Sequence, residues 1–469
     1  MINFKQYYRL ITEGGQYGHM FNPYEDHTLS FFNLKDMISQ MFSGSITEVK
    51  EKTDGQALSV SFRDDMGVIF SRNKTHTIAG VTGDKKAALR GARQVGEKFG
   101  QAPDHVKETF MSGAAALEKA IRVLSPAQRR KLFGNGTRWV AVEIIHGNNP
   151  NVIPYLEVDG KGKRSLIVLH SYREYDASGA VVDSDFDEYG RMMAGMIKQK
   201  GKAHIGDYRI MSMPMIKLRV NDAEGTHVTN FKEMSMRFAA EVDSIRGQFG
   251  LSDDNTIGDY WLSFMTQQVQ DAFAQQGFSV EPGFHKRLAA RFVAKKLPKF
   301  KNHPEYKHAI THVRDIEFQL GKNEQTKSIR AWLNNFEGSP EHNRVYNAMI
   351  NPLKLLTLNV GTQFLSNMGE YLTLNPSETA KDIKSSIDRT VADIRSSGDE
   401  DKISKLDAQL DIIKKLGGLD KIVPTEGVTF TYTKPGVDAE GHPHEQVVYK
   451  LTGIFAPVNQ ILGSIKFSR

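Results

Sequence analysis

The chain contains no cysteine among its 469 residues. That absence excludes disulfide bonds, thiolate zinc sites and thiol catalysis, and it fits a reducing compartment, so we expect a cytoplasmic protein. No stretch approaches a membrane span and the N-terminus has no apolar signal region, so we expect no membrane partner. A nucleophile elbow and a zincin helix are also missing. Charge is plentiful: the formal net charge of +6 favours a polyanionic partner.

A short motif whose residues are suited to catalysis is Lys52-Thr53-Asp54-Gly55, which spans the junction of the runs Ile46 to Thr53 and Gln56 to Arg63. Polar and apolar residues alternate in both runs, which predicts two strands with Asp54-Gly55 at their junction. A lysine there can act as a covalent nucleophile if burial or nearby positive charge favours its neutral amine. The alternative is a solvent-facing lysine beside a hairpin turn, because Asp-Gly is a favoured turn pair.

Two further strands carry residues suited to binding. Gly67 to Ser71 predicts a strand that delivers Arg72 to the same end of the sheet. Glu143 interrupts the apolar run Arg138 to Ile145, and a buried acid needs a partner. The partner of Glu143 would be a sugar hydroxyl, a metal ion or a neighbouring lysine.

Further strands that carry residues suited to binding are expected later in the chain. The strand expected from Ser165 ends near Tyr172, an aromatic residue able to stack on a base, and Tyr175 is an equal candidate. Pro424 to Tyr432 predicts a strand with Glu426 at its start, and Gln446 to Leu451 predicts another that carries Lys450.

The order Lys-x-Asp-Gly, Ser-Arg-Asn, strand Glu, aromatic strand, Glu-Gly-Val and strand Lys resembles the covalent nucleotidyltransferase superfamily. This superfamily comprises ATP-dependent DNA ligases, RNA ligases and mRNA capping enzymes, and the chain is most similar to RNA ligase-like adenylation domains. The resemblance implies ATP and magnesium (Mg2+) as cofactors. It assigns the AMP-linked nucleophile to Lys52, nucleotide binding to Asp54, Gly55, Arg72, Glu143, Tyr172 and Lys450, and metal binding to Glu426.

The sequence departs from the family pattern at two points. Motif V usually has two lysines separated by one residue, whereas Lys450 is followed by Leu451 and Thr452. The interval from Asp176 to Glu426 is far longer than in the family, and Leu451 to Arg469 is too short to form the OB-fold that ligases usually append. We therefore expect a large insertion and no C-terminal OB-fold.

The expected insertion is mainly helical, with apolar residues at three- and four-residue spacing over Phe238 to Phe249, Trp261 to Gln276, Phe284 to Leu297 and Glu341 to Leu356. Ser377 to Leu416 predicts two more charged helices. Clustered cations in this insertion predict nucleic-acid binding through phosphates. The candidates are Lys286, Arg287, Arg291, Lys295, Lys296, Lys299 and Lys301, with Glu305 as the only acidic residue opposing them. The alternative is a solvated basic helix whose aromatic residues anchor the core.

Taken together, these features predict an α+β fold. An antiparallel-sheet, ATP-grasp-like nucleotidyltransferase core would occupy residues 1–180 and 420–469, with the helical insertion at 181–419. The predicted function is an ATP-dependent polynucleotide ligase, with RNA favoured over DNA, that seals 5′-phosphate and 3′-hydroxyl ends. Two alternatives stay open: an adenylyl- or guanylyltransferase that does not join strands, and an inactive nucleic-acid-binding scaffold.

Overall fold

The computed structural model describes most of the chain: residues 20–53, 55–146, 165–185, 188–212, 226–281, 283–307, 324–366, 376–419, 422–423, 425–435 and 446–466. Within these ranges the named strands form two sheets, and the pairs are antiparallel except for β6 with β9. The prediction of an α+β fold with mainly antiparallel sheets is therefore confirmed.

The small sheet joins segments that lie far apart in the chain. Its order is β1 (Thr47–Lys52), β10 (Gly427–Thr433) and β11 (Gln446–Thr452). Val428, Phe430 and Tyr432 on β10 are fully buried. Because side chains alternate along a strand, these residues define an apolar face, and the residues between them lie on an opposite, polar face.

The large sheet has the order β4-β3-β2-β5-β6-β9-β8, and β7 pairs with β6. Its strands are β2 (Gln56–Arg63), β3 (Gly67–Ser71), β4 (Leu89–Arg90), β5 (Arg138–Ile145), β6 (Ser165–Tyr175), β7 (Val181–Asp185), β8 (His204–Ile205) and β9 (Tyr208–Ser212). The strands β7 to β9, which fall within the expected insertion, therefore belong to this sheet.

Helices cover one face of the large sheet with an apolar core. They are α4 (Gly91–Lys98), α5 (Asp104–Arg122), α6 (Pro126–Phe133) and α7 (Glu188–Gln199). α6 illustrates how the sequence sets a helix: Ser125 and Gln128 form a capping box, and Gly134 ends the helix at a φ of 53°. The helix α3 (Lys74–Thr82) packs on the opposite face, where Gly80 lies against Trp139.

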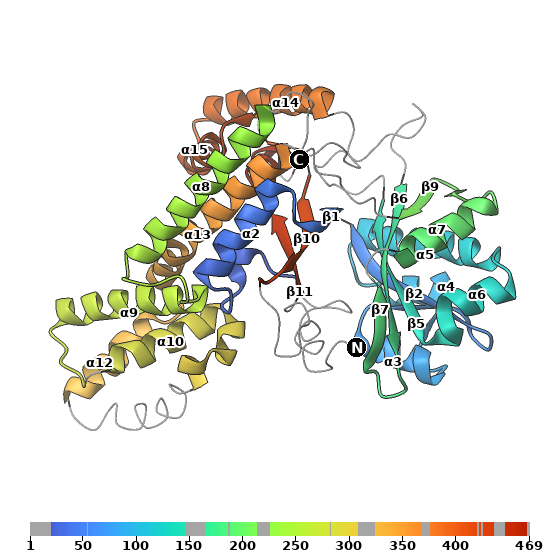
Figure 1. Cartoon of the computed structure of the whole chain (residues 1–469), viewed down its shortest axis with the longest axis horizontal. Coiled ribbons are helices and arrows are strands. Elements are labelled where there is room, and N and C mark those ends of the chain that lie inside the picture. Colours follow the sequence, from blue (N-terminus) through green and yellow to red (C-terminus); the bar gives the residue numbers. More distant parts are fainter. Residues whose placement is uncertain are drawn as a thin grey trace.

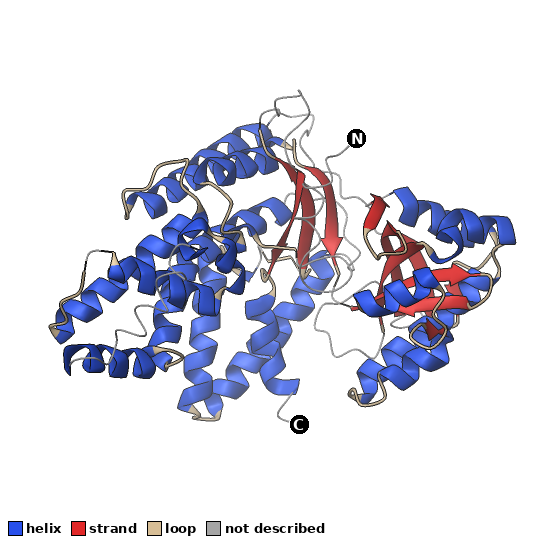
Figure 2. Ribbon diagram, turned by 90° about the horizontal axis from the view of Figure 1, so that it is seen from below, coloured by secondary structure: helices blue, strands red, loops and turns tan. Residues whose placement is uncertain are grey.

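A helical region packs on the apolar face of the small sheet and shares one core with it. It comprises α2 (Phe31–Ser43), α8 (Thr226–Gly247), α9 (Ile257–Gln276), α10 (Phe284–Lys296), η3 (Pro298–Asn302), α12 (Glu324–Phe336), α13 (Pro340–Ser366), α14 (Pro376–Ser396), α15 (Glu400–Lys415) and α16 (Ala456–Lys466). Figures 1 and 2 show the small sheet between this region and the large sheet. Short 3-10 helices η1 (Pro23–Glu25) and η2 (Gly134–Gly136) complete the described elements.

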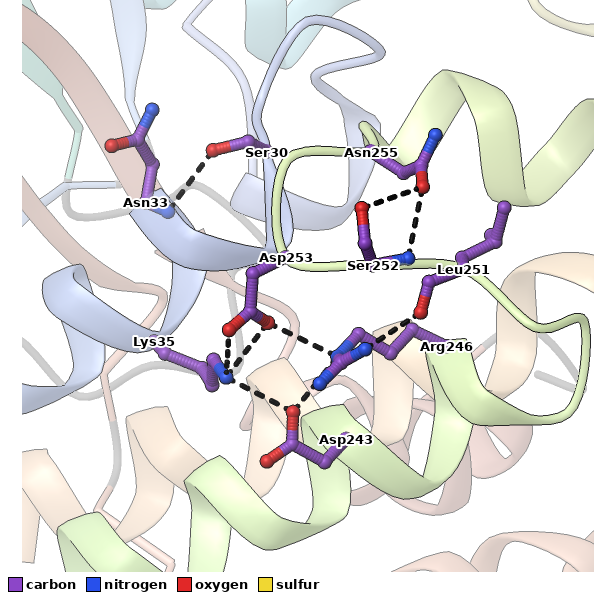
Figure 3. A network of polar contacts seen from close by, with 9 residues as sticks. All are labelled: Ser30, Asn33, Lys35, Asp243, Arg246, Leu251, Ser252, Asp253 and Asn255. Carbon is purple, nitrogen blue, oxygen red and sulfur yellow. Dashed lines mark hydrogen bonds and ion pairs between the residues drawn. The ribbon is translucent and has the colours of Figure 1, made fainter.

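A polar network fastens α2 to α8 and to the loop that precedes α9 (Figure 3). Lys35 Nζ lies 3.0 Å from Asp243 Oδ1 and 2.7 Å from Asp253 Oδ1. Arg246 Nε lies 2.8 Å from the same Asp243 oxygen, and its Nη1 donates to the Leu251 carbonyl at 2.6 Å. Four charges thus satisfy one another where α2 meets α8 and the loop before α9.

None of the described helices combines the length and the apolar character that crossing a bilayer requires.

Candidate active site

Lys52 is the last residue of β1, and the register of the small sheet determines its neighbours. It pairs with Gly427 on β10, so the preceding residue, Glu426, lies beside it. Lys52 Nζ is 2.5 Å from Glu426 Oε1, and the two side chains are 24% and 28% exposed. The predicted nucleophile and the predicted metal ligand therefore form one partly buried ion pair.

The chain after Lys52 crosses from one sheet to the other. β1 lies in the small sheet and β2 in the large sheet, so the two strands are not hairpin partners. The alternative of a solvent-facing lysine beside a hairpin turn is therefore wrong. Asp54, at the middle of the crossing, lies outside the described residues.

Glu143 holds this crossing from β5. Its Oε2 accepts a hydrogen bond from Thr53 Oγ1, and its Oε1 accepts one from Gly55 N at 2.9 Å. His170 Nε2 on β6 lies 3.2 Å from Glu143 Oε2. The acid expected to need a partner thus has three, and they include both residues that flank Asp54.

Gly55 lets the crossing approach β5 closely. A Cβ atom at this position would lie 2.8 Å from Glu143 Cγ and 2.8 Å from the Ile144 carbonyl oxygen. Such contacts are too short for any side chain, and the backbone oxygen is not free to move away. Glycine is therefore required here for close approach.

The surroundings of Glu143 favour its charged form. Burial raises the pKa of Glu143, but the hydrogen bond and electrostatic interaction with His170, together with the charge of Lys52, hold the pKa below its ordinary value. The carboxylate of Glu143 is therefore an anion at neutral pH.

Arg72 lies at the end of β3, where the sequence predicts it. Its guanidinium donates to the Ala57 carbonyl on β2, and its Cζ lies 5.3 Å from the centre of the Phe110 ring. Burial lowers the pKa of Arg72, whereas the charge of Glu143 raises it. Arg72 and Glu143 thus interact electrostatically across the start of β2.

Tyr172 is placed apart from this cluster. It is 7% exposed within the helix-covered core, its hydroxyl donates to Asp183 at 2.5 Å, and its ring centre is 4.1 Å from that of Tyr189. Burial raises its pKa. Tyr175 is buried beside Trp139. The ring that contacts Glu143 is instead that of His170, which the sequence interpretation missed.

The strand alternation offered a signal for His170. Val168 pairs with Glu143, so the residue two positions further along β6, His170, lies on the same face of the sheet. The register of β5 and β6 shifts between Val140 and Val142. Beyond this irregularity the side chains of β6 no longer alternate in the same phase, so Tyr172 does not lie on the face of His170. No sequence pattern indicated a role for Thr53, because its partner, Glu143, lies far away in the sequence.

Lys450 lies on β11, in the same sheet as Lys52. It pairs with Thr429 on β10, and Thr429 pairs on its other side with Lys50 of β1. Its backbone N–H donates to the Phe21 carbonyl at 2.8 Å. Sheet register thus brings Lys450 to the face that carries Lys52.

The basic residues of α10 have acidic partners that the sequence interpretation did not foresee. Besides Glu305, which is 3.0 Å from Lys286, the acids Glu281 and Glu337 take part. The further contacts are Arg287 with Glu281, Arg291 with Glu337 at 3.2 Å, Lys295 with Glu337 at 3.1 Å, and Lys296 with Asn343 at 2.5 Å. The inference that Glu305 alone opposes these cations is wrong, since α12 and its following turn bring Glu337 to them.

Two of the predicted phosphate-binding cations lie on η3. Lys299 Nζ is 3.4 Å from the centre of the Phe21 ring, a cation–π contact, and Lys301 is exposed. These two lysines follow α10 and are separate from the ion pairs around Glu337.

Among the described residues, no group of three or more His, Asp and Glu side chains is arranged to hold a metal ion. In the described part of the chain, the carboxylate of Glu426 lies 2.5 Å from Lys52 Nζ, and that of Glu143 interacts with Lys52 electrostatically. Magnesium commonly takes one or two protein carboxylates and fills its other positions with phosphate oxygens and water. The carboxylates of Glu426 and Glu143 fit a magnesium ion that is bound in this way.

Comparison of the chain with models of known protein families, with curated proteins and with solved structures found no match. The family resemblance therefore rests on the sequence motifs alone and stays a prediction.

Proposed function

We propose that this protein is an ATP-dependent polynucleotide ligase that acts through a covalent lysyl-AMP intermediate. The observation that supports it best is the meeting of Lys52, Glu426 and Glu143. Short motifs that match a family by chance have no reason to converge in space. Here, the three residues come from separate segments and gather at one end of β1.

In the proposed reaction, Lys52 Nζ attacks the α-phosphate of ATP. The new bond is N–P, and the bond between the α-phosphorus and the bridging oxygen breaks, so pyrophosphate leaves with the electron pair. Lysine must lose a proton before it attacks, and the carboxylate 2.5 Å away, Glu426, is the nearest acceptor. Glu143 keeps the lysine loop in place through Thr53 and Gly55.

Magnesium would be held by Glu426 together with phosphate oxygens, and it would supply neutralisation of the phosphate charge. Arg72 adds a fixed positive charge beside Glu143. After pyrophosphate departs, AMP passes to a 5′-phosphate, and a 3′-hydroxyl displaces AMP to seal the strand.

The proposed substrate is a nucleic acid, with RNA favoured over DNA. On the helical region, the exposed Lys301 of η3 is a cation proposed to meet a phosphate backbone, whereas the α10 cations Lys286, Arg287 and Arg291 have Glu305, Glu281 and Glu337 as partners.

The first test is to incubate the protein with magnesium and α-labelled ATP or GTP, beside Lys52→Ala, and to measure label that survives denaturation. We expect label from ATP in the wild-type protein and none in the variant, because the amine is the attachment point. The protein must first be shown to be free of bound AMP.

Other outcomes would redirect the proposal. Label from GTP alone would support a guanylyltransferase that does not join strands. Label from ATP without sealing of nicked RNA or DNA would support an adenylyltransferase. No label from either nucleotide would overturn the proposal in favour of a binding scaffold.

A further inference from the structure

Each residue of the candidate ion pair is next to a buried threonine. Thr53 follows Lys52 in the chain, and Thr425 precedes Glu426. Both threonines are 0% exposed. A hydroxyl at this depth needs hydrogen-bond partners within the protein, because it has lost those that water would supply. Glu143 is the partner of Thr53, and the partners of Thr425 show how the other side of the ion pair is held.

Glu51 is a buried acid on the side of β1 that faces the helical core. It is 2% exposed, and it pairs with Val428, which belongs to that core. Directly paired residues share a face, and successive residues of a strand alternate between faces. Glu51 and Lys52 therefore point to opposite sides of the same strand. A carboxylate buried in this way requires polar partners.

Thr425 supplies one of these partners. Its Oγ1 donates to Glu51 Oε1 at 3.1 Å, within the buried interior. The same hydroxyl oxygen accepts from Gly427 N at 3.3 Å and lies 3.2 Å from the Gly427 carbonyl oxygen. A threonine hydroxyl that bonds to the backbone two residues further on closes a tight turn. Glu426 is the middle residue of this turn.

Strand β1 thus fixes both members of the ion pair. Lys52 is its last residue, and the preceding residue, Glu51, anchors the turn that carries Glu426. The backbone pairing of Lys52 with Gly427 holds the other end of the turn. A displacement of about 1 Å in such an arrangement is enough to cost catalysis, so the contact between the turn and Glu51 controls how Glu426 meets the amine.

We propose that Glu51 and Thr425 are positioning residues that hold the carboxylate of Glu426 against Lys52. The consequence for nucleotide transfer rests on the proposed function, in which Glu426 accepts a proton from Lys52. The ion pair is then held from two directions. Glu143 acts on the segment after Lys52, and Glu51 acts on the turn that carries Glu426.

Zero-length cross-linking tests this geometry without any nucleotide. A carbodiimide activates a carboxylate, and an amine in contact with it displaces the urea to form an amide. We expect a cross-link between Lys52 and Glu426 in the wild-type protein, detected by mass spectrometry after digestion. Thr425→Val keeps the branched shape but lacks the hydroxyl, so the yield should fall about tenfold. Thr425→Ser, which keeps a hydroxyl, should restore most of the yield.

Thr431→Val is the matched control on the same strand. Thr431 is 5% exposed and donates to Glu48 Oε2 at 2.6 Å, so this variant also loses a buried hydrogen bond between β10 and β1, but away from the ion pair. We expect it to lower the free energy of unfolding about as much as Thr425→Val does and to keep the wild-type yield of cross-link.

Thr425→Ala keeps the test decisive if Thr425→Val does not fold, because it removes the same hydroxyl without placing a methyl group beside Glu51. We expect the same loss of cross-link in this variant. Equal losses in Thr425→Val and Thr431→Val would reveal a general effect on the fold and would overturn the positioning role. Wild-type yield in both Thr425 variants would overturn it as well.

Self-labelling with ATP measures the consequence for the proposed reaction. In Thr425→Val we expect the maximal rate to fall about tenfold with the KM for ATP within about twofold of wild type, and we expect Thr425→Ser to recover the rate. The expected cross-links in a protein that forms no label would support the positioning role and overturn the proposed function. Normal labelling by Thr425→Val despite a lost cross-link would leave the ligase proposal intact and overturn the role of Thr425 in it.

Discussion

At the scale of single residues, the most informative feature is that Glu143 holds the segment that follows Lys52, the proposed nucleophile. A carboxylate has about four acceptor sites, and three are occupied by Thr53, Gly55 and His170. The family resemblance assigns this acid to the ribose. In this chain its visible contacts hold the crossing between the sheets, so we regard it as a positioning residue for Lys52.

Glu143→Gln tests that role. Thr53 and Gly55 donate to different oxygens of the carboxylate, and an amide replaces one of these oxygens with an NH2 group that cannot accept, so one of the two hydrogen bonds is lost. We expect the rate of self-labelling to fall about tenfold to a hundredfold, with a smaller effect on the KM for ATP. Glu174→Gln, which changes an acid paired with Arg138 in the same sheet, should label normally. A Glu143→Gln rate equal to wild type would contradict the positioning role.

At the scale of elements, the crossing from β1 to β2 determines where Lys52 lies. The strands belong to different sheets, and the short segment between them is held against β5 by Glu143 and by the close approach of Gly55. Moving this segment would move the end of β1. The function proposed for Lys52 therefore depends on a glycine that performs no chemistry itself.

Gly55→Ala tests this dependence. The new methyl group would lie 2.8 Å from the Ile144 carbonyl oxygen, so the crossing must shift, and we expect self-labelling to fall at least about tenfold. Gly195→Ala on α7 is the matched control, because no atom lies within 4 Å of its added methyl group. Alanine at that helical position should leave labelling unchanged and stabilise the fold slightly. Normal labelling by Gly55→Ala would disprove the steric argument.

At the scale of the whole molecule, stability should depend on pH through buried histidines. Burial lowers the pKa of His76, His285 and His303. Burial also lowers the pKa of His342 from 6.5 to about 4. That side chain is fully buried, and its Nε2 makes no hydrogen bond with the described residues. A folded pKa below the unfolded one means that the unfolded chain takes up more protons.

We therefore expect the free energy of unfolding to fall as the pH drops from about 6.5 to about 4. His342 alone would contribute about 3 kcal/mol to this fall, at about 1.4 kcal/mol per pKa unit. Urea unfolding across this range measures it. His342→Phe should flatten the slope, whereas His204→Phe, at an exposed position, should keep it. An unchanged slope in His342→Phe would refute the assignment.

Prediction from sequence succeeded where the signal is local. The runs Gln56 to Arg63, Gly67 to Ser71 and Arg138 to Ile145 form strands with those bounds, because alternation or continuous apolar character reflects the faces that a strand buries. Helices α9 and α10 likewise follow their apolar spacing. The predicted boundary between core and insertion, at residue 180, does not coincide with the edge of the large sheet. Strand β9 pairs with β6, although the helix α7 lies between them in the sequence.

The sequence by itself predicted seven strands (β1, β2, β3, β5, β6, β10 and β11), helical stretches within α8, α9, α10, α13, α14 and α15, and which residues carry charge at strand ends, but not α2 to α7 or β7 to β9. Only the tertiary structure decided the partners of these residues: Lys52 with Glu426, Glu143 with Thr53 and Gly55, and Lys50 and Lys450 on either side of Thr429. Hydrophobic periodicity is a property of neighbouring residues, so a single sequence reveals it. Register between distant strands depends on the packing of the whole core, and that packing is what turns separate motifs into one candidate site.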